Sequence, residues 1–232
     1  MSAEDASARI AIVVGATGLV GSALCRQLQR DGRYDPVVVL TRRPLPLEGP
    51  PLQVETIDFS RLDEWKPEVA VDTVFCALGT TMHKAGSEVA FRAVDQDLVL
   101  AVARLARRAR ARHFVMVSSI GANASAAPFY LRVKGETEDA VAAMDLPHVA
   151  VLRPSLLTGE RTERRPSERW LQLAGRLLAP LMIGKLARYR PIAGEDVATA
   201  MRVLAASERA GFEVIETGAI GRLVRSERVL PF

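Results

Sequence analysis

Several kinds of residue and segment are scarce in this chain of 232 residues, and each scarcity excludes a class of protein. The two cysteines, Cys25 and Cys76, are too few for a disulfide framework, and their apolar surroundings predict inert buried thiols. No uninterrupted apolar run approaches the roughly 18 residues that a membrane span needs. The polar, acidic start of the chain has neither the basic nor the apolar region of a secretory signal peptide. We therefore expect a cytoplasmic protein that does not enter a membrane.

Charge of one sign and aromatic residues are also in short supply. The net charge is only +4, from 31 basic and 27 acidic residues, and aromatic residues make up 5% of the chain. A nucleic-acid patch would combine cations with aromatic side chains, so no nucleic-acid partner is expected. The three histidines lie far apart, without the spacing of metal ligands, and no metal site is expected. His83 follows an expected strand and is either a plain loop residue or a substrate contact.

What the sequence does contain is an alternation of short β-branched runs with segments of helical periodicity. This alternation is typical of a parallel sheet covered by helices on both faces. Strands are expected at 10–14, 37–40, 52–57, 71–77, 114–117 and 149–152, and helices at 19–30, 88–110, 131–144, 170–181 and 195–205. The length suits one domain. We predict a single α/β domain of the Rossmann type, with a doubly wound parallel sheet.

The ends of the chain and its proline-rich stretch complete the expected organisation. Residues 1–8 are expected to be disordered, and residues 9–232 to form the nucleotide-binding domain. Short C-terminal elements, at about 155–190 and 219–232, are expected to cover the substrate. The prolines within 43–51 predict a loop rather than a domain linker, because strand-like residues follow at once.

A glycine-rich turn between the first strand and the first helix is the strongest single motif. Gly15, Gly18 and Gly21 stand three residues apart, directly after a buried strand. In such a turn the first glycine permits the tight bend, the second lets a pyrophosphate approach the backbone, and the third lets helix and strand pack closely. The alternative is a tight turn that binds nothing. We predict a dinucleotide site at Gly15, Ala16, Thr17, Gly18, Leu19, Val20 and Gly21.

A tyrosine and a lysine four residues apart form the second motif. With three tyrosines and four lysines in the chain, the spacing of Tyr130 and Lys134 is unusual by chance. On a helix the two side chains lie one turn apart on one face. The ammonium then favours the phenolate, which makes the phenol usable as an acid or base near neutral pH. Ser118 and Ser119 end a strand at the carboxyl edge of the expected sheet, where such folds bind ligands.

Together these motifs resemble the atypical short-chain dehydrogenase/reductases of the Tat-interactive oxidoreductase-like family, over nearly the whole chain. The glycine spacing resembles that of the wider superfamily, and the residues that carry the likeness lie at 75–81, 84–87, 113–114, 118–119, 130–136 and 153–154. The likeness implies a nicotinamide cofactor and a catalytic set of Ser119, Tyr130 and Lys134. Ser155 departs from the family, which commonly has glycine after Arg-Pro, and the charged loop at 161–169 also diverges.

The resemblance further implies where the cofactor binds. In the superfamily an acidic residue after the second strand accompanies NAD(H), but here Arg42 and Arg43 follow that strand. Unless they are simply solvated, two guanidinium groups suit the 2′-phosphate of NADP(H), so we expect NADP(H) rather than NAD(H). Asp58 resembles the acid that contacts adenine, or else caps a helix. The remaining expected cofactor contacts are Leu78, Gly79, Thr80, Ser118, Tyr130, Lys134, Pro154, Leu157 and Arg165.

The function that we predict is an NADPH-dependent oxidoreductase acting on a small, rather apolar carbonyl-type substrate, with Tyr130 as general acid and base. Two alternatives stay open. The chain could bind NADPH as a sensor or regulatory protein that acts through partners without turnover, or it could catalyse an epimerase or dehydratase type of reaction. The stretch after Arg153-Pro154 is short for a nucleotide-sugar domain, which counts against the last. The pattern leaves the oligomeric state open.

Overall fold

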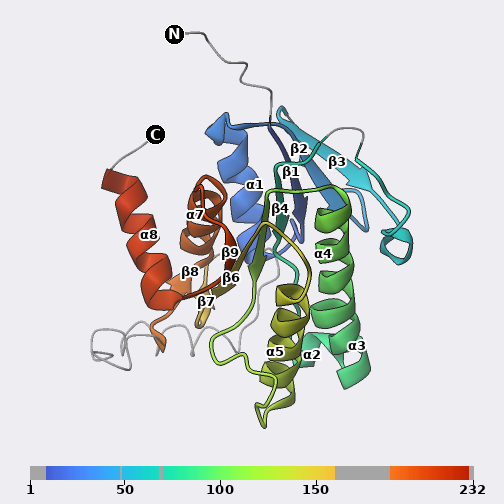
Figure 1. Ribbon diagram of the computed structural model, residues 1–232, viewed down its shortest axis with the longest axis vertical. Helices are drawn as coiled ribbons and strands as arrows, with labels where there is room; N and C mark the ends of the chain where they lie inside the picture. The colour runs from blue at the N-terminus through green and yellow to red at the C-terminus, as the bar shows by residue number, and fades with distance from the viewer. Residues whose placement is uncertain (1–8, 48, 68–69, 160–188, 230–232) are drawn as a thin grey trace.

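A seven-stranded parallel sheet lies at the centre of the computed structural model, which describes residues 9–47, 49–67, 70–159 and 189–229 (Figure 1). The strand order is β3-β2-β1-β4-β5-β6-β9, and every neighbouring pair is parallel. The predicted doubly wound Rossmann-type sheet is therefore confirmed. The strands are β1 (Arg9–Val14), β2 (Tyr34–Thr41), β3 (Leu52–Thr56), β4 (Thr73–Cys76), β5 (His113–Val117), β6 (His148–Arg153) and β9 (Gly211–Glu216).

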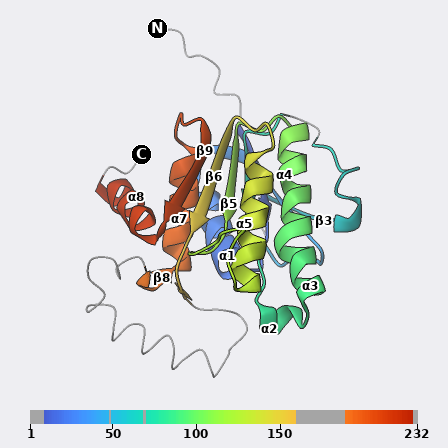
Figure 2. The same cartoon turned by 60° about the horizontal axis from the view of Figure 1, so that its bottom comes forward.

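Helices cover both faces of this sheet (Figure 2). One face carries α1 (Leu19–Asp31), α7 (Gly194–Ala205) and α8 (Thr217–Val229), and the other carries α4 (Leu98–Arg108) and α5 (Phe129–Ala142). Two apolar clusters result, because alternate strand residues face opposite sides. In β1, for example, Ala11 and Val13 belong to the cluster beneath α1 and α7, whereas Ile12 and Val14 belong to the cluster beneath α4.

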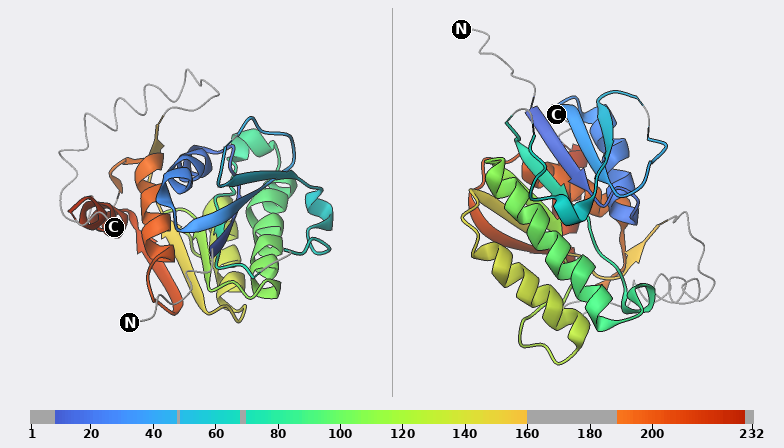
Figure 3. Two further views of the ribbon diagram at one scale, coloured as in Figure 1. Left: turned by 90° about the horizontal axis from the view of Figure 1, so that it is seen from above. Right: turned by 90° about the vertical axis from the view of Figure 1, so that its right-hand side faces the viewer.

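The order of the strands decides where a ligand can bind. The chain runs outward from β1 through β2 to β3 and then returns to the other side of β1 to form β4. The two connections therefore leave in opposite directions at the carboxyl ends of β1 and β4, and folds of this kind are expected to form a ligand crevice at such a switch point. Both the glycine turn and the stretch after β4 lie at this edge, and the views in Figure 3 show the sheet between its two helical layers.

The structure differs from the predicted helix at 88–110, which it divides into three parts. Residues Glu88–Arg92 form α3, Ala93–Asp97 form a π-helical turn, and α4 begins at Leu98. A π turn adds one residue to a helical turn, and such turns are frequent at functional sites. Hydrophobic periodicity continues on both sides of the inserted residue, so the sequence pattern alone does not distinguish the turn from ordinary helix.

The C-terminal third also contains elements that the pattern did not predict. Strand β9 extends the sheet beside β6, and α8 packs against α7. A second small sheet pairs β7 (Leu157–Thr158) with β8 (Ile192–Ala193), near α1. The helix predicted at 170–181 lies outside the described residues, and the substrate-covering role of the C-terminal elements stays a prediction. Short helical segments comprise α2 (Met82–Ala85) and the 3₁₀ turn Phe59–Arg61.

Two negative findings concern the described residues only. None of their helices is both long enough and apolar enough to cross a membrane. Within the same ranges, no group of three or more histidine, cysteine and acidic side chains is arranged to hold a metal ion.

A buried pair of histidines lies at the edge of the sheet opposite the crevice. His113 begins β5 and His148 begins β6, and their Nδ1 atoms are 2.9 Å apart. His148 also contacts Glu213 of β9, with 3.1 Å between Nε2 and Oε1. Burial lowers the pKa of His113, and nearby His148, Arg112 and Arg9 lower it further against the opposing effect of Asp72. The imidazole of His113 is therefore neutral in the folded protein at neutral pH.

We expect this pair to make the fold sensitive to acid. Because the pKa of His113 lies below its ordinary value of 6.5 in the folded state, the unfolded chain binds more protons as the pH falls below 6.5, and stability falls with it. Protonation of His113 alone lowers the free energy of unfolding by at most about 1.4 kcal/mol for each pH unit. Urea unfolding of the wild type and of His113→Asn, from about pH 7 to about pH 5, measures this difference.

The exposed residue His83 supplies the matched control. His83→Asn should leave the pH dependence of stability unchanged, because the side chain of His83 stays exposed to water in the folded protein. If His113→Asn loses stability with acid as steeply as the wild type does, His113 does not cause the acid sensitivity of the fold.

Candidate functional site

In the glycine turn, the fold requires glycine at positions 15 and 21 but not at position 18. Gly15 has a φ of 91°, and a Cβ there would overlap the backbone of Ala77. A Cβ on Gly21 would overlap the carbonyl group of Gly15. Gly18, in contrast, has φ −78° and ψ 166°, which any residue adopts, and a Cβ there would lie 3.3 Å from Gly15 O and 3.8 Å from Ala77 O. The fold itself would need to shift by only a few tenths of an ångström to accept a side chain at Gly18.

The helix that follows this turn is prepared for an anion. Gly18 is the N-cap of α1, and no side chain caps the first turn, which also contains no acidic residue. The backbone N–H groups and the positive end of the helix dipole therefore act without a competing carboxylate. Thr17 and Gly18 are exposed, whereas Ala16, Val20 and Gly21 are buried. These observations fit the pyrophosphate of a dinucleotide at Gly18.

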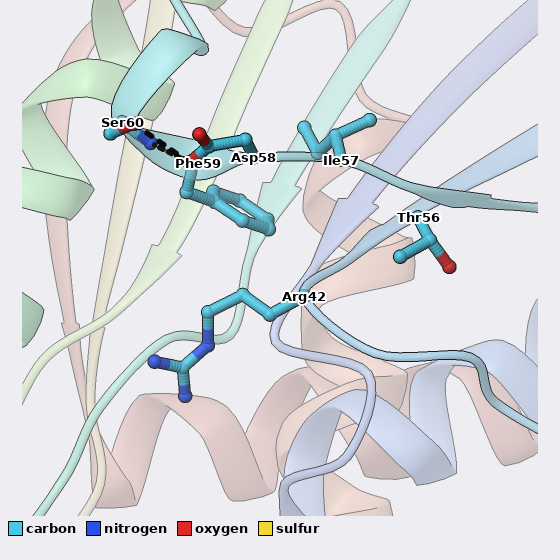
Figure 4. A pocket seen from close by; sticks show the side chains of 6 residues that line it. All are labelled: Arg42, Thr56, Ile57, Asp58, Phe59 and Ser60. Carbon is cyan, nitrogen blue, oxygen red and sulfur yellow. Dashed lines mark hydrogen bonds between the residues drawn. The ribbon is translucent and has the colours of Figure 1, made fainter.

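A surface cavity of about 540 Å³ lies at the ends of the two strands beyond β1 (Figure 4). Arg42 borders it from the loop after β2, and Asp58 and the ring of Phe59 border it from the segment after β3. Arg43 is not among the lining residues, although its carbonyl group accepts a hydrogen bond from Thr41 Oγ1 at 2.8 Å. The structure thus places Arg42, and not Arg43, at the cavity.

Asp58 has a local partner as well as a place beside the cavity. Its Oδ1 accepts hydrogen bonds from Ser60 N at 2.9 Å and Ser60 Oγ at 2.7 Å, so the carboxylate caps the 3₁₀ turn. The hydrogen bonds from Ser60 lower the pKa of Asp58, which keeps the carboxylate charged. The capping role is therefore present, and contact with adenine stays a prediction.

The tyrosine and lysine lie in the first two turns of α5. Tyr130 is half-buried, and its ring centroid lies 5.4 Å from that of Phe91, which comes from α3. Lys134 is 4% exposed, and its ammonium lies 2.7 Å from Oδ1 of Asp95 in the π-helical turn. Asp95 is itself fully buried. The structure therefore joins the predicted pair to a third, acidic residue.

Asp95 is held from two directions. Its Oδ2 accepts a hydrogen bond from Thr80 N at 2.8 Å, and its carbonyl oxygen accepts one from Thr137 Oγ1 on α5 at 3.2 Å. Burial by itself would lower the pKa of Lys134, but the Asp95 carboxylate, together with Tyr130 and Cys76, outweighs that effect, and the pKa of Lys134 lies above its ordinary value. Lys134 is therefore a charged ammonium in a dry environment.

Sequence reasoning missed Asp95, although a signal was present. Phe91, Asp95 and Val99 are spaced by four residues, so Asp95 occupies an apolar position of a helical stripe. An acidic residue there must be buried with a partner, since burying an unpaired charge is costly. The four lysines of the chain then leave few candidates for that partner.

The two serines after β5 have different surroundings. Ser118 is buried, and its hydroxyl donates to Oε1 of Glu138, a buried residue of α5. Arg153, at the end of β6, donates from Nε to both oxygens of Glu138, at 3.1 and 3.0 Å. Ser118 is therefore tied to an ion pair that the sequence analysis also missed. Ser119 is half-buried, and its hydroxyl makes only a long 3.4 Å contact with Ile120 O.

Gly135 allows the loop that contains Ser119 to pack closely against α5. A Cβ on Gly135 would overlap the backbone of Asn123 and Ala124, so this loop lies directly against α5. Asn123 N also donates to Leu131 O at 3.1 Å. The close approach places the segment after Ser119 against the same helical turns that carry Tyr130 and Lys134.

The other residues expected at the cofactor lie in the segments after β4 and β6. Leu78, Gly79 and Thr80 follow β4, and a Cβ on Gly79 would lie 3.5 Å from Asp95 Oδ1 and 3.7 Å from Lys134 Nζ. Pro154 is buried directly after β6, and Leu157 begins β7. Arg165 lies outside the described residues.

Two further residues can be placed from the structure. Ser155, where a departure from the family was noted, donates from N to Thr217 Oγ1 at 2.9 Å and from its hydroxyl to Arg190 O. Its side chain thus connects the end of β6 to the segment before β8. His83 lies exposed on α2.

Comparison with known proteins gives one family match and several relatives. Residues 15–173 match the family model described as NAD(P)H-binding. The chain is 38% identical over 163 residues to protein HTATIP2 of Rattus norvegicus, a match that covers 68% of this chain and 66% of that protein. It is 34% identical over 229 residues to the mitochondrial protein FMP52 of Eremothecium gossypii, over 94% of this chain and 98% of that protein.

A solved structure described as MoeE5 in complex with UDP-glucose and NAD has a similar fold. It superimposes with a TM-score of 0.62 and 20% sequence identity, over 95% of this chain and 81% of that chain. At this identity the likeness supports the fold alone.

The expected cytoplasmic location is wrong, because the relatives point elsewhere. The FMP52 protein of Eremothecium gossypii is named mitochondrial, and those of Candida albicans and Debaryomyces hansenii carry the same designation. The expectation rested on the absence of a secretory signal peptide. That absence bears on secretion and does not bear on import into an organelle.

The contrast between the glycines leads to a prediction. Gly18→Val should leave the fold intact and abolish binding of NAD(P)H, because the new side chain occupies the approach of the pyrophosphate and not the packing of the turn. Fluorescence transfer from protein to reduced nicotinamide reports binding, and circular dichroism reports folding.

Gly21→Ala is the contrasting variant. It should lose folded protein as well as binding, because its Cβ would overlap the backbone of Gly15. Wild-type affinity in Gly18→Val would show that the turn does not hold the pyrophosphate.

Proposed function

The chain belongs to the NAD(P)H-binding family, and on that premise we propose that it is an NADP(H)-dependent oxidoreductase of the short-chain dehydrogenase/reductase type. Its substrate is a small, rather apolar carbonyl compound. The observation that carries the proposal is the buried Lys134 ammonium one helical turn from Tyr130, at the carboxyl edge of the sheet that also bears the glycine turn. A protein that only bound the nucleotide would not need this arrangement.

The chain offers separate groups to each part of the cofactor. Backbone N–H groups in the first turn of α1, from Leu19 onward, suit the pyrophosphate, and the cavity at Arg42 and Asp58 suits the adenosine end. At the other end, Lys134 and the Gly79 backbone lie where the nicotinamide ribose would be held in this type of fold. When bound, the nicotinamide supplies a hydride to an electrophilic carbon or accepts one.

Tyr130 completes the reaction by moving a proton. As the substrate carbon accepts two electrons and a hydrogen nucleus, the C=O π bond breaks and its electrons pass to oxygen. Tyr130 gives its hydroxyl proton to that oxygen, and solvent later returns a proton to the phenolate. The charged Lys134 stabilises the phenolate in the interval, because the two groups are one turn apart.

The remaining roles concern orientation and the choice of substrate. Ser119 donates a hydrogen bond to the same substrate oxygen, which holds the carbonyl group toward Tyr130. Phe91 packs against the ring of Tyr130 and supports an apolar wall, which favours a substrate without charge next to its carbonyl.

The preference for NADP(H) follows from the cation at the cavity. Arg42 forms charge-assisted hydrogen bonds with the 2′-phosphate, and such bonds contribute about 1.5–3 kcal/mol each. Arg42→Ala should therefore weaken NADPH binding by about tenfold or more and leave NADH binding nearly unchanged. Titration of both cofactors by fluorescence measures the two affinities.

Two controls accompany this experiment. Arg43→Ala should have a smaller effect than Arg42→Ala, because Arg43 is not among the residues that line the cavity. Arg107→Ala removes an exposed cation from the end of α4 and should change neither affinity. Equal affinity of the wild type for the two cofactors would contradict the preference.

The proposed role of Tyr130 is tested by removing one oxygen atom. Tyr130→Phe should leave NADPH affinity nearly unchanged and reduce turnover about 100-fold or more, which is the usual effect of a positioned acid or base. Lys134→Ala should impair both affinity and turnover. A panel of carbonyl compounds, followed by NADPH absorbance, identifies a substrate for these measurements.

Tyr34→Phe is the matched control, since it removes a buried hydroxyl that contacts Thr73 far from the crevice. It should retain turnover. Undiminished turnover in Tyr130→Phe would overturn the mechanism, and a wild type that binds NADPH tightly yet stays inert across the panel would favour a sensing role.

A further inference from the structure

We propose that Asp95 is a positioning residue that acts through Lys134 and, as its counter-charge, sets the pH at which the Tyr130–Lys134 pair loses its first proton. The proposal rests on the proposed function, because it assigns Asp95 a part in the acid–base role of Tyr130. Its observational basis is the 2.7 Å contact between a fully buried carboxylate and a buried ammonium.

The two oxygens of Asp95 have separate tasks. Oδ2 accepts the hydrogen bond from Thr80 N, which holds the loop after β4. Oδ1 faces the Lys134 ammonium at 2.7 Å, and no other hydrogen-bond partner of this oxygen is found among the described residues. An asparagine would serve Thr80 equally well, since its carbonyl oxygen also accepts. Only Lys134 therefore requires a full negative charge at this position.

The local backbone keeps this charge in place. The π-helical turn carries Asp95 on the buried side of the helix, and Thr137 of α5 donates to the carbonyl oxygen of the same residue. The backbone of Gly79 lies beside the ion pair, since a Cβ there would be in van der Waals contact with both Asp95 and Lys134. The hydrogen bonds from Thr80 and Thr137 thus hold Asp95 beside the ammonium.

Charge arithmetic gives the direction of the effect. With Asp95 ionised, the cluster of Asp95, Lys134 and Tyr130 is neutral before its first proton leaves and carries a net negative charge afterwards. With a neutral residue at 95, the same step starts from a net positive charge and ends at zero. In a dry site the second step is easier, whichever of the two groups gives up the proton. Asp95 therefore keeps both protons in place at neutral pH.

The other titratable groups near the pair do not replace Asp95. The Cys76 thiol faces Lys134 from the end of β4, but burial raises its pKa to about 11, so it is neutral at working pH. Among the other charged residues of this part of α5, Glu136 pairs with Arg92 and Glu138 with Arg153, and Arg132 donates to the carbonyl oxygens of Ala126 and Ala127.

The consequence for catalysis is a bias toward proton donation. A pair that holds both protons at neutral pH presents Tyr130 as a phenol, which suits reduction of a carbonyl group. A pair that has lost one proton would instead suit oxidation of an alcohol, where Tyr130 must accept a proton. Asp95 thus favours the protonation state in which Tyr130 can donate a proton, as reduction of a carbonyl group requires.

The experiment follows the two protons directly, in protein without cofactor. With three tyrosines and four lysines in the chain, spectra of protein labelled with ¹³C at tyrosine Cζ and lysine Cε are simple. Tyr130→Phe and Lys134→Met identify the two signals. Asp95→Asn is the test variant, and Asp97→Asn, an exposed acid in the same π turn, is the matched control.

In Asp95→Asn the first of the two signals should titrate about 1 to 3 pH units lower than in the wild type, the usual effect of a close opposite charge. Asp97→Asn should titrate like the wild type. If the substitution only loosened the structure, stability would fall with no such displacement. An unchanged or higher titration midpoint in folded Asp95→Asn would overturn the proposal.

The wild type supplies a second measurement in case Asp95→Asn does not fold. Its pair should keep both protons through about pH 8, and proton loss below that pH would also overturn the proposal. Failure of the proposed function looks different. In that case the titration of Asp95→Asn moves as expected while no carbonyl compound is turned over.

Discussion

The burial of one ammonium group is the constraint on which the reactive half of this site depends. Lys134 is buried, which disfavours its charge, and the carboxylate of Asp95 at 2.7 Å is the nearest group that stabilises that charge. Replacing a buried ion pair with apolar residues often costs no stability, so such a pair is weak grounds for a purely structural role. The π-helical turn that delivers Asp95 is likewise an irregularity that regular helix would avoid. Both features make sense where a fixed charge has chemistry to perform.

The two halves of the crevice are built from different materials. Backbone groups form the proposed nucleotide half. Gly15 and Gly21 allow strand and helix to approach each other, and α1 begins without a capping side chain. At the reactive half, side chains from α5, the π turn and the loop after β4 converge. The strand order places the halves next to each other, because β1 and β4 are neighbours at the point where the connections diverge. A single edge of the sheet therefore carries both the proposed phosphate site and the proposed acid–base pair.

The sheet, the glycine turn and the spacing of Tyr130 and Lys134 could be predicted from the sequence, because each depends on local periodicity or on a short motif. Asp95 and the Glu138–Arg153 pair could not be assigned by the same means, since their partners are distant in the chain. The π turn could not be predicted because one inserted residue hardly changes the hydrophobic pattern of a helix. Strand β9 escaped because its edge position leaves Phe212 and Val214 exposed, so that it lacks the fully apolar run of the inner strands.

At the opposite edge of the sheet, burial and neighbouring charges also set the pKa of a basic side chain, but there the pKa falls. His113 and His148 are as buried as Lys134, yet His113 faces another imidazole and two arginines as well as Asp72, and its pKa falls. Lys134 faces one carboxylate at ion-pair distance, and its pKa rises. Burial alone would neutralise both groups. The nearest counter-charge decides which buried base stays charged, and only the crevice edge supplies one at 2.7 Å. The fold therefore keeps a positive charge beside Tyr130 and a neutral His113 imidazole at its far end.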